Sequence, residues 1–165
     1  MRLLSILATA VIAAAACCNP NQKELTVVPY PNSVDINCGV FKANGADFNY
    51  DAAIDARSTA LISSFAEQLS LVSGTQNKLV EATEGNGFLF LLDESLPAEA
   101  YTLKISRGKA VVKASGLNGF NYAIQTIKQM LPVEIYGKTE APGKEWTLLC
   151  CEIEDEPRFG YRGMH

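Results

Sequence analysis

The chain has 165 residues, of which 48% are hydrophobic and 19% are charged, and its formal net charge is −4. This length fits one domain, and this composition supplies a core, which excludes a mostly disordered chain. The acidic balance argues against a nucleic-acid-binding protein, which needs a basic face. The single histidine is the last residue, His165. The sequence therefore excludes a multi-histidine metal site and a catalytic triad whose histidine lies inside the fold.

The first residues have the pattern of an export signal. Arg2 precedes an apolar run over residues 3–16, which is too short for a stable membrane span and has the length of a signal-peptide core. The small residues before Cys17 resemble a bacterial lipobox, although Ala14 stands where leucine is usual. The favoured interpretation is lipidation of Cys17, and Cys18 is a second candidate with a less suitable preceding context. The alternative is plain secretion with cleavage after a small residue.

The predicted export divides the chain and sets its compartment. We expect residues 1–18 to be a signal peptide of the lipoprotein type and residues 19–24 to be a tether. The folded part is then lipid-anchored in the outer membrane or the periplasm, where disulfides are permitted. We favour buried free thiols over a bridge from Cys38 to Cys150 or Cys151. The last two are adjacent, so on a strand they point to opposite faces.

The first half of the folded part predicts short strands and then a helix. Residues 25–31 are rich in β-branched side chains and are broken by prolines, which indicates an edge strand. Residues 51–73 carry apolar side chains at helical spacing, with Asp51 as the N-cap and Gly74 as the terminating glycine. This stripe is expected to pack against a sheet. Further short strands are expected around residues 34–36, 40–42 and 47–49.

The second half predicts a buried strand, a hairpin, a helix and a last strand. A continuous apolar run is typical of a strand buried on both faces, and strict alternation is typical of a half-buried hairpin. The helix has Phe120, Ile124 and Ile127 on one face and ends at Pro132. These elements are expected at residues 87–92, 101–106, 109–114, 116–132 and 146–153.

This order of elements predicts an α+β fold, a mixed β-sheet with two helices packed on one face. The residues themselves offer little chemistry. The one acidic cluster comprises Glu152, Glu154, Asp155 and Glu156, and it is interpreted as a solvated strand end rather than a general acid–base pair. From the residues alone we expect no catalytic group, no metal site and no cofactor.

The last residues match a family pattern. Residues 153–164 resemble the segment I-x-D-x-P-R-F-x-Y-R-G-x that joins the N-terminal domain of family 20 β-N-acetylhexosaminidases to their catalytic barrel. Three other segments resemble patterns of the same family in the same order along the chain. They are residues 28–32 (P-x-P), residues 99–103 (E-x-Y-x-L) and residues 119–132 (G-x-x-x-G-x-Q-T-L-x-Q-L-L, with Ala123 at the second glycine).

This resemblance implies a zincin-like domain without a metal site, followed by a catalytic (β/α)₈ barrel. In that barrel an Asp-Glu pair and the acetamido group of the substrate remove terminal N-acetylhexosamine from glycans. Neither acid falls within this chain. The resemblance therefore implies that residues 25–153 form the non-catalytic N-terminal domain and that residues 154–165 form the linker and the start of the missing barrel. The implied partners are that barrel, the glycan through it, and the membrane through the lipid anchor.

Two arginines of the last motif are candidates for contact with the sugar site or with the domain junction. Arg162 is interpreted either as a barrel-mouth residue that supports the sugar site by pairing with a carboxylate, or as part of a salt bridge at the domain junction. For Arg158 we favour the junction salt bridge. The alternative function for the whole chain is a stand-alone, lipid-anchored module that binds a glycan or a protein.

Overall fold

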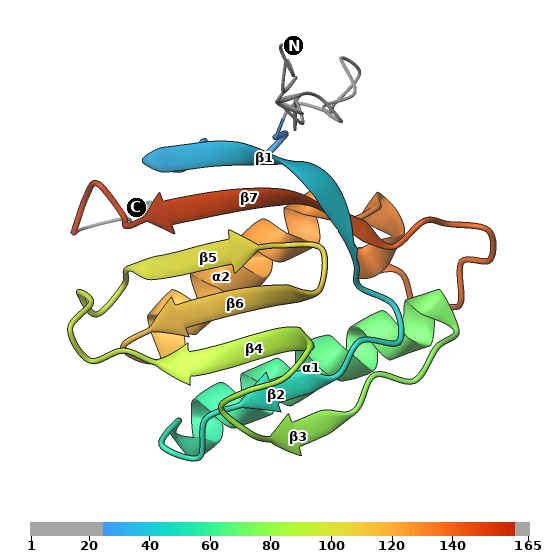
Figure 1. The fold of residues 1–165 in the computed structure, drawn as a ribbon, viewed down its shortest axis with the longest axis horizontal. Helices are drawn as coiled ribbons and strands as arrows, with labels where there is room; N and C mark the ends of the chain where they lie inside the picture. The colour runs from blue at the N-terminus through green and yellow to red at the C-terminus, as the bar shows by residue number, and fades with distance from the viewer. Residues whose placement is uncertain (1–24, 161–165) are drawn as a thin grey trace, which may run out of the picture.

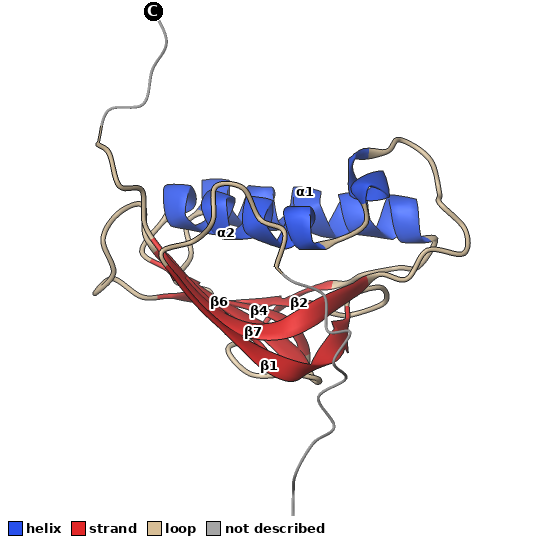
Figure 2. Cartoon of the chain, turned by 90° about the horizontal axis from the view of Figure 1, so that it is seen from above, coloured by secondary structure: helices blue, strands red, loops and turns tan. Residues whose placement is uncertain are grey.

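One seven-stranded mixed sheet, with two α-helices on one of its faces, makes up residues 25–160, the part of the chain that the computed structural model describes (Figure 1). Both helices lie on the same side (Figure 2), which confirms the predicted α+β class. No helix in this range is both long enough and apolar enough to cross a membrane. The elements in chain order are β1 (Ser33–Lys42), β2 (Phe48–Tyr50), α1 (Ala56–Ser73), β3 (Leu79–Glu81), β4 (Gly87–Leu92), β5 (Tyr101–Ile105), β6 (Lys109–Ala114), α2 (Leu117–Met130), the 3-10 helix η1 (Val133–Tyr136) and β7 (Thr147–Asp155).

The last strand pairs with the first. The strand order is β1-β7-β5-β6-β4-β2-β3, so β7 lies between β1 and β5, and it is antiparallel to both. On the other side of the sheet, β6, β4, β2 and β3 are parallel neighbours. Tyr101 at the start of β5 pairs with Asp155 at the end of β7, and Ser33 at the start of β1 pairs with Glu154. The starts of β1 and β5 therefore meet the end of β7.

Aromatic rings from the sheet and from α1 form the centre of the core. The ring centroid of Phe48 lies 4.4 Å from that of Phe88 on β4 and 5.3 Å from that of Phe65 on α1. All three rings are buried, and each such pair adds about 0.5–1.5 kcal/mol to the energy of burial. The predicted face of α2 packs on the same side of the sheet, with Phe120 and Ile124 completely buried.

Helix α1 begins later than the sequence predicts. Its N-cap is Asp55, which accepts hydrogen bonds from the backbone N–H groups of Arg57 and Ser58. The Ser58 hydroxyl also donates to it, and this bond is the largest cause of the lowered pKa of the Asp55 carboxyl. Asp51 caps a separate turn that precedes the helix. The predicted end is confirmed, because Gly74 adopts the left-handed conformation with φ of 67°.

The start of the domain differs from the prediction. Residues 25–31 belong to no strand, and their prolines lack the N–H that a ladder needs. The strands expected at 34–36 and 40–42 are one strand, β1, whose register shifts between Ile36 and Val40. Neither β3 nor η1 was predicted, because three or four residues carry too little periodicity. The other predicted strands and α2 are confirmed to within two residues at each end.

The cysteines follow the prediction in part. Cys150 and Cys151 are free and buried, as expected, and burial raises the pKa of Cys151 to about 11. Cys151 belongs to the core, whereas Cys150 lies beside Gly39 of β1. The expected free thiol at Cys38 is wrong: Cys38 is disulfide-bonded, and its partner is neither of these two cysteines. It lies in the irregular part of β1 and is half-buried, so the core does not enclose it.

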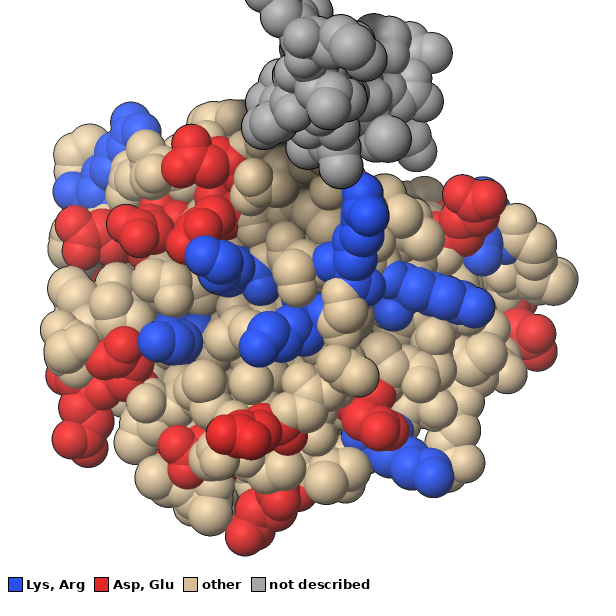
Figure 3. Space-filling model, viewed as in Figure 1, with Lys and Arg blue, Asp and Glu red and all other residues tan. Residues whose placement is uncertain are grey.

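The face of the sheet that points away from the helices is open and polar. Lys and Arg side chains gather across the middle of this face, while acidic side chains lie mostly toward its edges (Figure 3). The alternation of strand side chains explains the contrast between the two faces. Along β5, for example, Leu103 is completely buried under the helices, whereas its neighbour Lys104 is exposed.

A buried hydroxyl pair joins α2 to the sheet. The hydroxyl of Tyr101 on β5 lies 2.7 Å from Oγ1 of Thr126 on α2, and both side chains are buried. Burial raises the pKa of Tyr101 to about 12, and the neighbouring Asp155 carboxylate adds to the rise. The phenol is therefore held in its neutral form, in which it bonds to the helix.

We predict that this phenol makes the domain sensitive to alkali. A folded-state pKa of about 12, against about 10 in an unfolded chain, gives stability that is complete below pH 10 and is lost as the pH rises from 10 to 12. Full loss amounts to about 2–3 kcal/mol of unfolding free energy. Urea titrations across this window measure it, with Tyr101→Phe expected to flatten the slope. Tyr136→Phe, which alters an exposed phenol, is the control. Equal slopes in Tyr101→Phe and the parent would contradict the prediction.

Candidate functional site

The structure separates the acidic cluster that the sequence places together. Glu152 faces the open side of the sheet and forms an ion pair with Lys104 at 2.9 Å. Asp155 and Glu156 lie at the end of β7, where both accept hydrogen bonds from Asn32. The cluster is thus divided between two surfaces, and it provides no pair of carboxylates facing a common substrate position. This agrees with its interpretation as a solvated strand end.

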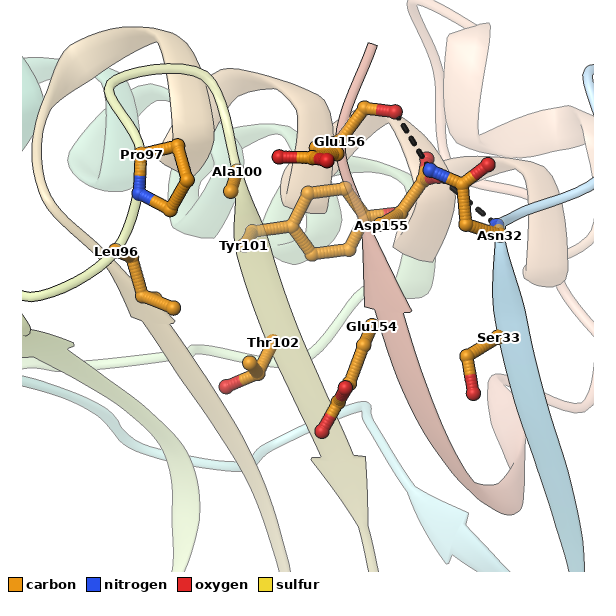
Figure 4. Close-up of a pocket in the computed structure, with 10 residues that line it drawn as sticks. All are labelled: Asn32, Ser33, Leu96, Pro97, Ala100, Tyr101, Thr102, Glu154, Asp155 and Glu156. Carbon is orange, nitrogen blue, oxygen red and sulfur yellow. Dashed lines mark hydrogen bonds between the residues drawn. The ribbon is translucent and has the colours of Figure 1, made fainter. Parts of the chain in front are cut away.

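Two adjoining hollows lie where β1 and β5 begin and β7 ends. The smaller has a volume of about 290 Å³ and lies between the loop before β5 and the end of β7 (Figure 4). The larger has a volume of about 550 Å³ and extends along α2 to the last described residues. We call the larger one the α2 groove. Both hollows are lined by Asn32, Tyr101, Asp155 and Glu156.

Asn32 holds the end of the chain against its beginning. Its backbone N–H donates to Oδ1 of Asp155 at 3.0 Å, and its side-chain amide donates to the carbonyl of Glu156 at 2.8 Å (Figure 4). Its amide oxygen accepts a hydrogen bond from Nε of Arg158 at 3.0 Å. The ion pairs that the structure shows within residues 25–160 are Lys104–Glu152 and Lys144–Glu134, and neither includes Arg158. Its junction salt bridge with a following domain therefore stays a prediction.

The α2 groove is walled by three segments that are far apart in the sequence. One wall is the extended segment before β1, which α2 fixes because Gln129 accepts a hydrogen bond from the N–H of Val28 at 2.9 Å. The floor is the outer face of α2, where Tyr122 donates to the carboxylate of Glu99 at 3.1 Å. The third wall is the segment after β7 and ends in Phe159. The groove thus combines aromatic rings with amide groups.

The described residues of the groove offer polar and aromatic groups that can bind a partner. Within residues 25–160 no group of three or more His, Cys, Asp or Glu side chains is placed to hold a metal ion. The one strongly perturbed polar group in the groove, Tyr101, is bonded to Thr126 and holds its proton more firmly than usual. No described residue there forms a nucleophile–base pair. Aromatic and amide side chains in a groove fit a neighbouring protein surface or a sugar ring.

Sequence reasoning missed the residue that organises the site. Asn32 lies in the segment 28–32 that resembles a family pattern, but its side chain had no assigned role. Its partners are 123 to 126 residues away in the chain, so no local signal relates them. Two of the predicted site residues, Cys17 and Arg162, lie outside the described residues.

Comparison with known proteins identifies the domain. Residues 24–156 match the family model described as glycosyl hydrolase family 20, domain 2. The chain is 28% identical over 155 residues to beta-hexosaminidase subunit A1 of Dictyostelium discoideum, covering 87% of this chain and 27% of that protein. It is 26% identical over 162 residues to the beta-hexosaminidase of Porphyromonas gingivalis, covering 89% of this chain and 20% of that protein. The chain thus spans about a fifth to a quarter of the length of these relatives.

Solved structures agree with the fold. A variant of the Streptomyces plicatus beta-hexosaminidase in complex with the product GlcNAc superimposes with a TM-score of 0.72 at 25% identity, covering 82% of this chain and 27% of that chain. The beta-N-acetylhexosaminidase of Streptomyces coelicolor gives a TM-score of 0.71 at 24% identity, covering 80% of this chain and 26% of that chain. The family model covers most of the chain, and the relatives are multidomain enzymes with a catalytic domain beyond this region. The chain therefore belongs to glycosyl hydrolase family 20 and corresponds to the N-terminal, non-catalytic domain of its beta-hexosaminidases.

Proposed function

We propose that this chain is the accessory domain of an exported enzyme that removes terminal N-acetylhexosamine residues from glycans. The observation that carries the proposal is the family match over residues 24–156, combined with relatives several times longer that are named beta-hexosaminidases. The residues described here offer a binding surface and no acid–base pair. Hydrolysis is therefore assigned to a catalytic domain that follows this one.

We propose that the α2 groove is the surface on which that catalytic domain docks. The described chain leaves at the groove, on the helix side of the sheet (Figure 2). Tyr30 and Phe159 line the groove and are 58% and 72% exposed, and the adjacent Val28 is 80% exposed. Clustered apolar exposure of this kind marks an interaction surface. A domain attached directly after Phe159 meets this surface first, at a high effective concentration.

The alternative is a stand-alone module that binds a glycan or a protein through the same groove. Its aromatic rings and amide groups also suit a sugar ring, which is the observation in favour of this alternative. The coding sequence after His165 distinguishes the two. A continuous reading frame that encodes a barrel with an Asp-Glu pair supports the accessory domain, and a stop codon supports the module.

Export, lipid anchoring and the role of Arg162 are further parts of the proposal. They rest on the sequence patterns at the two ends of the chain. A lipid on Cys17 places the enzyme at the outer membrane or in the periplasm, where glycan fragments are accessible to it. Arg162 follows the groove in the sequence, and we propose that it supports the sugar site indirectly by pairing with a carboxylate of the catalytic domain.

We predict that the purified chain alone does not hydrolyse an aryl N-acetylglucosaminide. A positioned general acid contributes about 10²–10⁴-fold to such a reaction, and the described residues supply neither that acid nor a carboxylate to orient the acetamido group. Release of the aryl alcohol measures the activity, with a complete family 20 enzyme as the positive control. Turnover by this chain that a substitution within residues 25–160 abolishes would contradict the assignment of catalysis to another domain.

We also predict that the groove stabilises the longer enzyme. Tyr30→Ser and Phe159→Ser should leave the thermal midpoint of the isolated chain unchanged, because both side chains are mostly exposed in it. In the enzyme that includes the catalytic domain, each should lower the unfolding free energy by about 1–3 kcal/mol, since burial of a large apolar side chain is worth that much. Val80→Ser, at the opposite edge of the sheet, is the control. Equal effects of all three substitutions on the longer enzyme would contradict the α2 groove as the docking surface of the catalytic domain.

The lipid anchor gives a separate prediction. In a diderm bacterial host, Cys17→Ser should abolish labelling of the protein by a fatty-acid analogue, because the thiol is the acceptor of the lipid. Cys150→Ser, which alters a free cysteine, is the control and should be labelled like the parent. Labelling that persists in Cys17→Ser, or a parent protein that carries no label, would remove the lipoprotein assignment while leaving the family assignment intact.

A further inference from the structure

We propose that the open face of the sheet binds an acidic polysaccharide, through a row of cations centred on the β5–β6 hairpin. We call this row the basic strip and define it as Lys42, Lys104, Arg107, Lys109 and Lys113. All five are exposed. Lys and Arg side chains gather across the middle of the face that points away from the helices (Figure 3). The domain as a whole is acidic, so this concentration of positive charge is a local feature.

The strand register explains how the cations come together. Lys104 of β5 pairs with Val111 of β6, so Lys109 and Lys113 are its two diagonal neighbours on the same face. Diagonal neighbours across an antiparallel pair lie about 7–8 Å apart. Lys104 therefore lies within about one Debye length of both Lys109 and Lys113, where like charges repel. Residues 101–114 contain no Asp or Glu that relieves this repulsion.

The turn end of the hairpin extends the strip toward β1. The side chain of Arg107 lies against the irregular part of β1, where a Cβ on Gly39 would come within 2.8 Å of its Nε atom. Gly39 has φ of +120°, so this close approach depends on a glycine. Lys42 ends β1 on the same face, because its neighbour Phe41 points into the core. The strip thus crosses the sheet from β1 to β6.

Carboxylates border the strip without neutralising it. Glu152 forms an ion pair with Lys104, whose side chains are 43% and 66% exposed, so it offsets the charge of Lys104 only in part. Glu154 lies opposite Thr102, at the other end of β5, and Asp93 lies near Lys113. Among the described residues, no ion pair involves Lys42, Arg107, Lys109 or Lys113. The positive field is therefore strongest at the turn end of the hairpin.

The chemistry of the strip selects the class of ligand. A lysine ammonium is a point charge that binds carboxylates and sulfates without a fixed geometry. Such groups suit a linear polymer whose negative charges repeat along the chain. The outward positions of the hairpin carry no aromatic ring. A site for neutral sugars uses such rings for stacking, and a membrane-binding surface inserts them into the lipid, so both are less suited to this surface. The choice of a carbohydrate rests on the proposed function. The described chain ends on the helix side of the sheet (Figure 2), and the proposed docking of the next domain there leaves the strip accessible.

The experiment measures binding of the full chain to two acidic probes, polygalacturonate and chondroitin sulfate, with neutral dextran as the blank. We expect binding to both acidic polymers at about 50 mM salt, and its loss near 0.5 M, because salt screens exposed charges. Lys42→Glu with Lys109→Glu should weaken binding at least about tenfold, since it reverses two of the five charges of the strip, one on β1 and one on β6. Circular dichroism confirms that the fold of the variant is intact, and the neutral pair Lys42→Gln with Lys109→Gln should give an intermediate loss.

Lys78→Glu with Lys138→Glu is the matched control, because it changes the net charge equally at two exposed lysines outside the strip. It should alter the affinity by less than about twofold. Equal losses in the two double variants would mean that only net charge matters, and would overturn the proposal. Absence of binding to both polymers, or tighter binding to phosphatidylglycerol vesicles than to either polymer, would also overturn it. Hydrolytic activity has no part in the measurement, so failure of the proposed function is distinguished from failure of this site.

Discussion

The position of the last strand determines the rest of the molecule. β7 is inserted between β1 and β5, and its end is hydrogen-bonded to the residue that precedes β1. Because β7 is antiparallel to both neighbours, its end lies at their beginnings. The sheet therefore forms only when the end of the domain, near residue 155, pairs with its beginning, near residue 32. The α2 groove is a consequence, since it forms where these two segments cross the face of α2.

The two faces of the sheet are divided by chemistry as well as by position. The helix side contains the aromatic core and, at its rim, the exposed apolar side chains Tyr30 and Phe159. No helix or strand of residues 25–160 packs on the other side, which carries charged side chains at its outward positions. A domain of this kind suits attachment through one face and exposure of the other. The proposed docking at the α2 groove and the proposed polyanion binding at the basic strip use opposite sides, so the two do not compete.

Some features of the candidate site were within reach of the sequence and others were not. The family pattern at residues 153–164 drew attention to this end of the chain, and Arg158 of that pattern lines the groove. The partner of Arg158 was not predictable, because it is the Asn32 amide, 126 residues away. The basic strip was hidden for a similar reason. The alternation of polar and apolar residues predicts that Lys104 and Lys113 lie on the same face. Their position as diagonal neighbours depends on the pairing register of β5 with β6, which the length of the turn at Arg107 sets. Arg107 itself meets β1 only because Gly39 leaves room for it.

The sequence by itself determined the elements with strong local signals. The hairpin at residues 101–114, the buried strand at residues 87–92 and both helices follow from periodicities that depend only on near neighbours, and so does the helix end at Gly74. The tertiary structure decided what depends on distant partners. It selected Asp55 over Asp51 as the cap, it left residues 25–31 without a strand partner, and it closed the sheet with β7. A strand, a cap or a groove of this kind exists only when another segment supplies its hydrogen bonds or its burial, and that segment is fixed by the fold and not by adjacent residues.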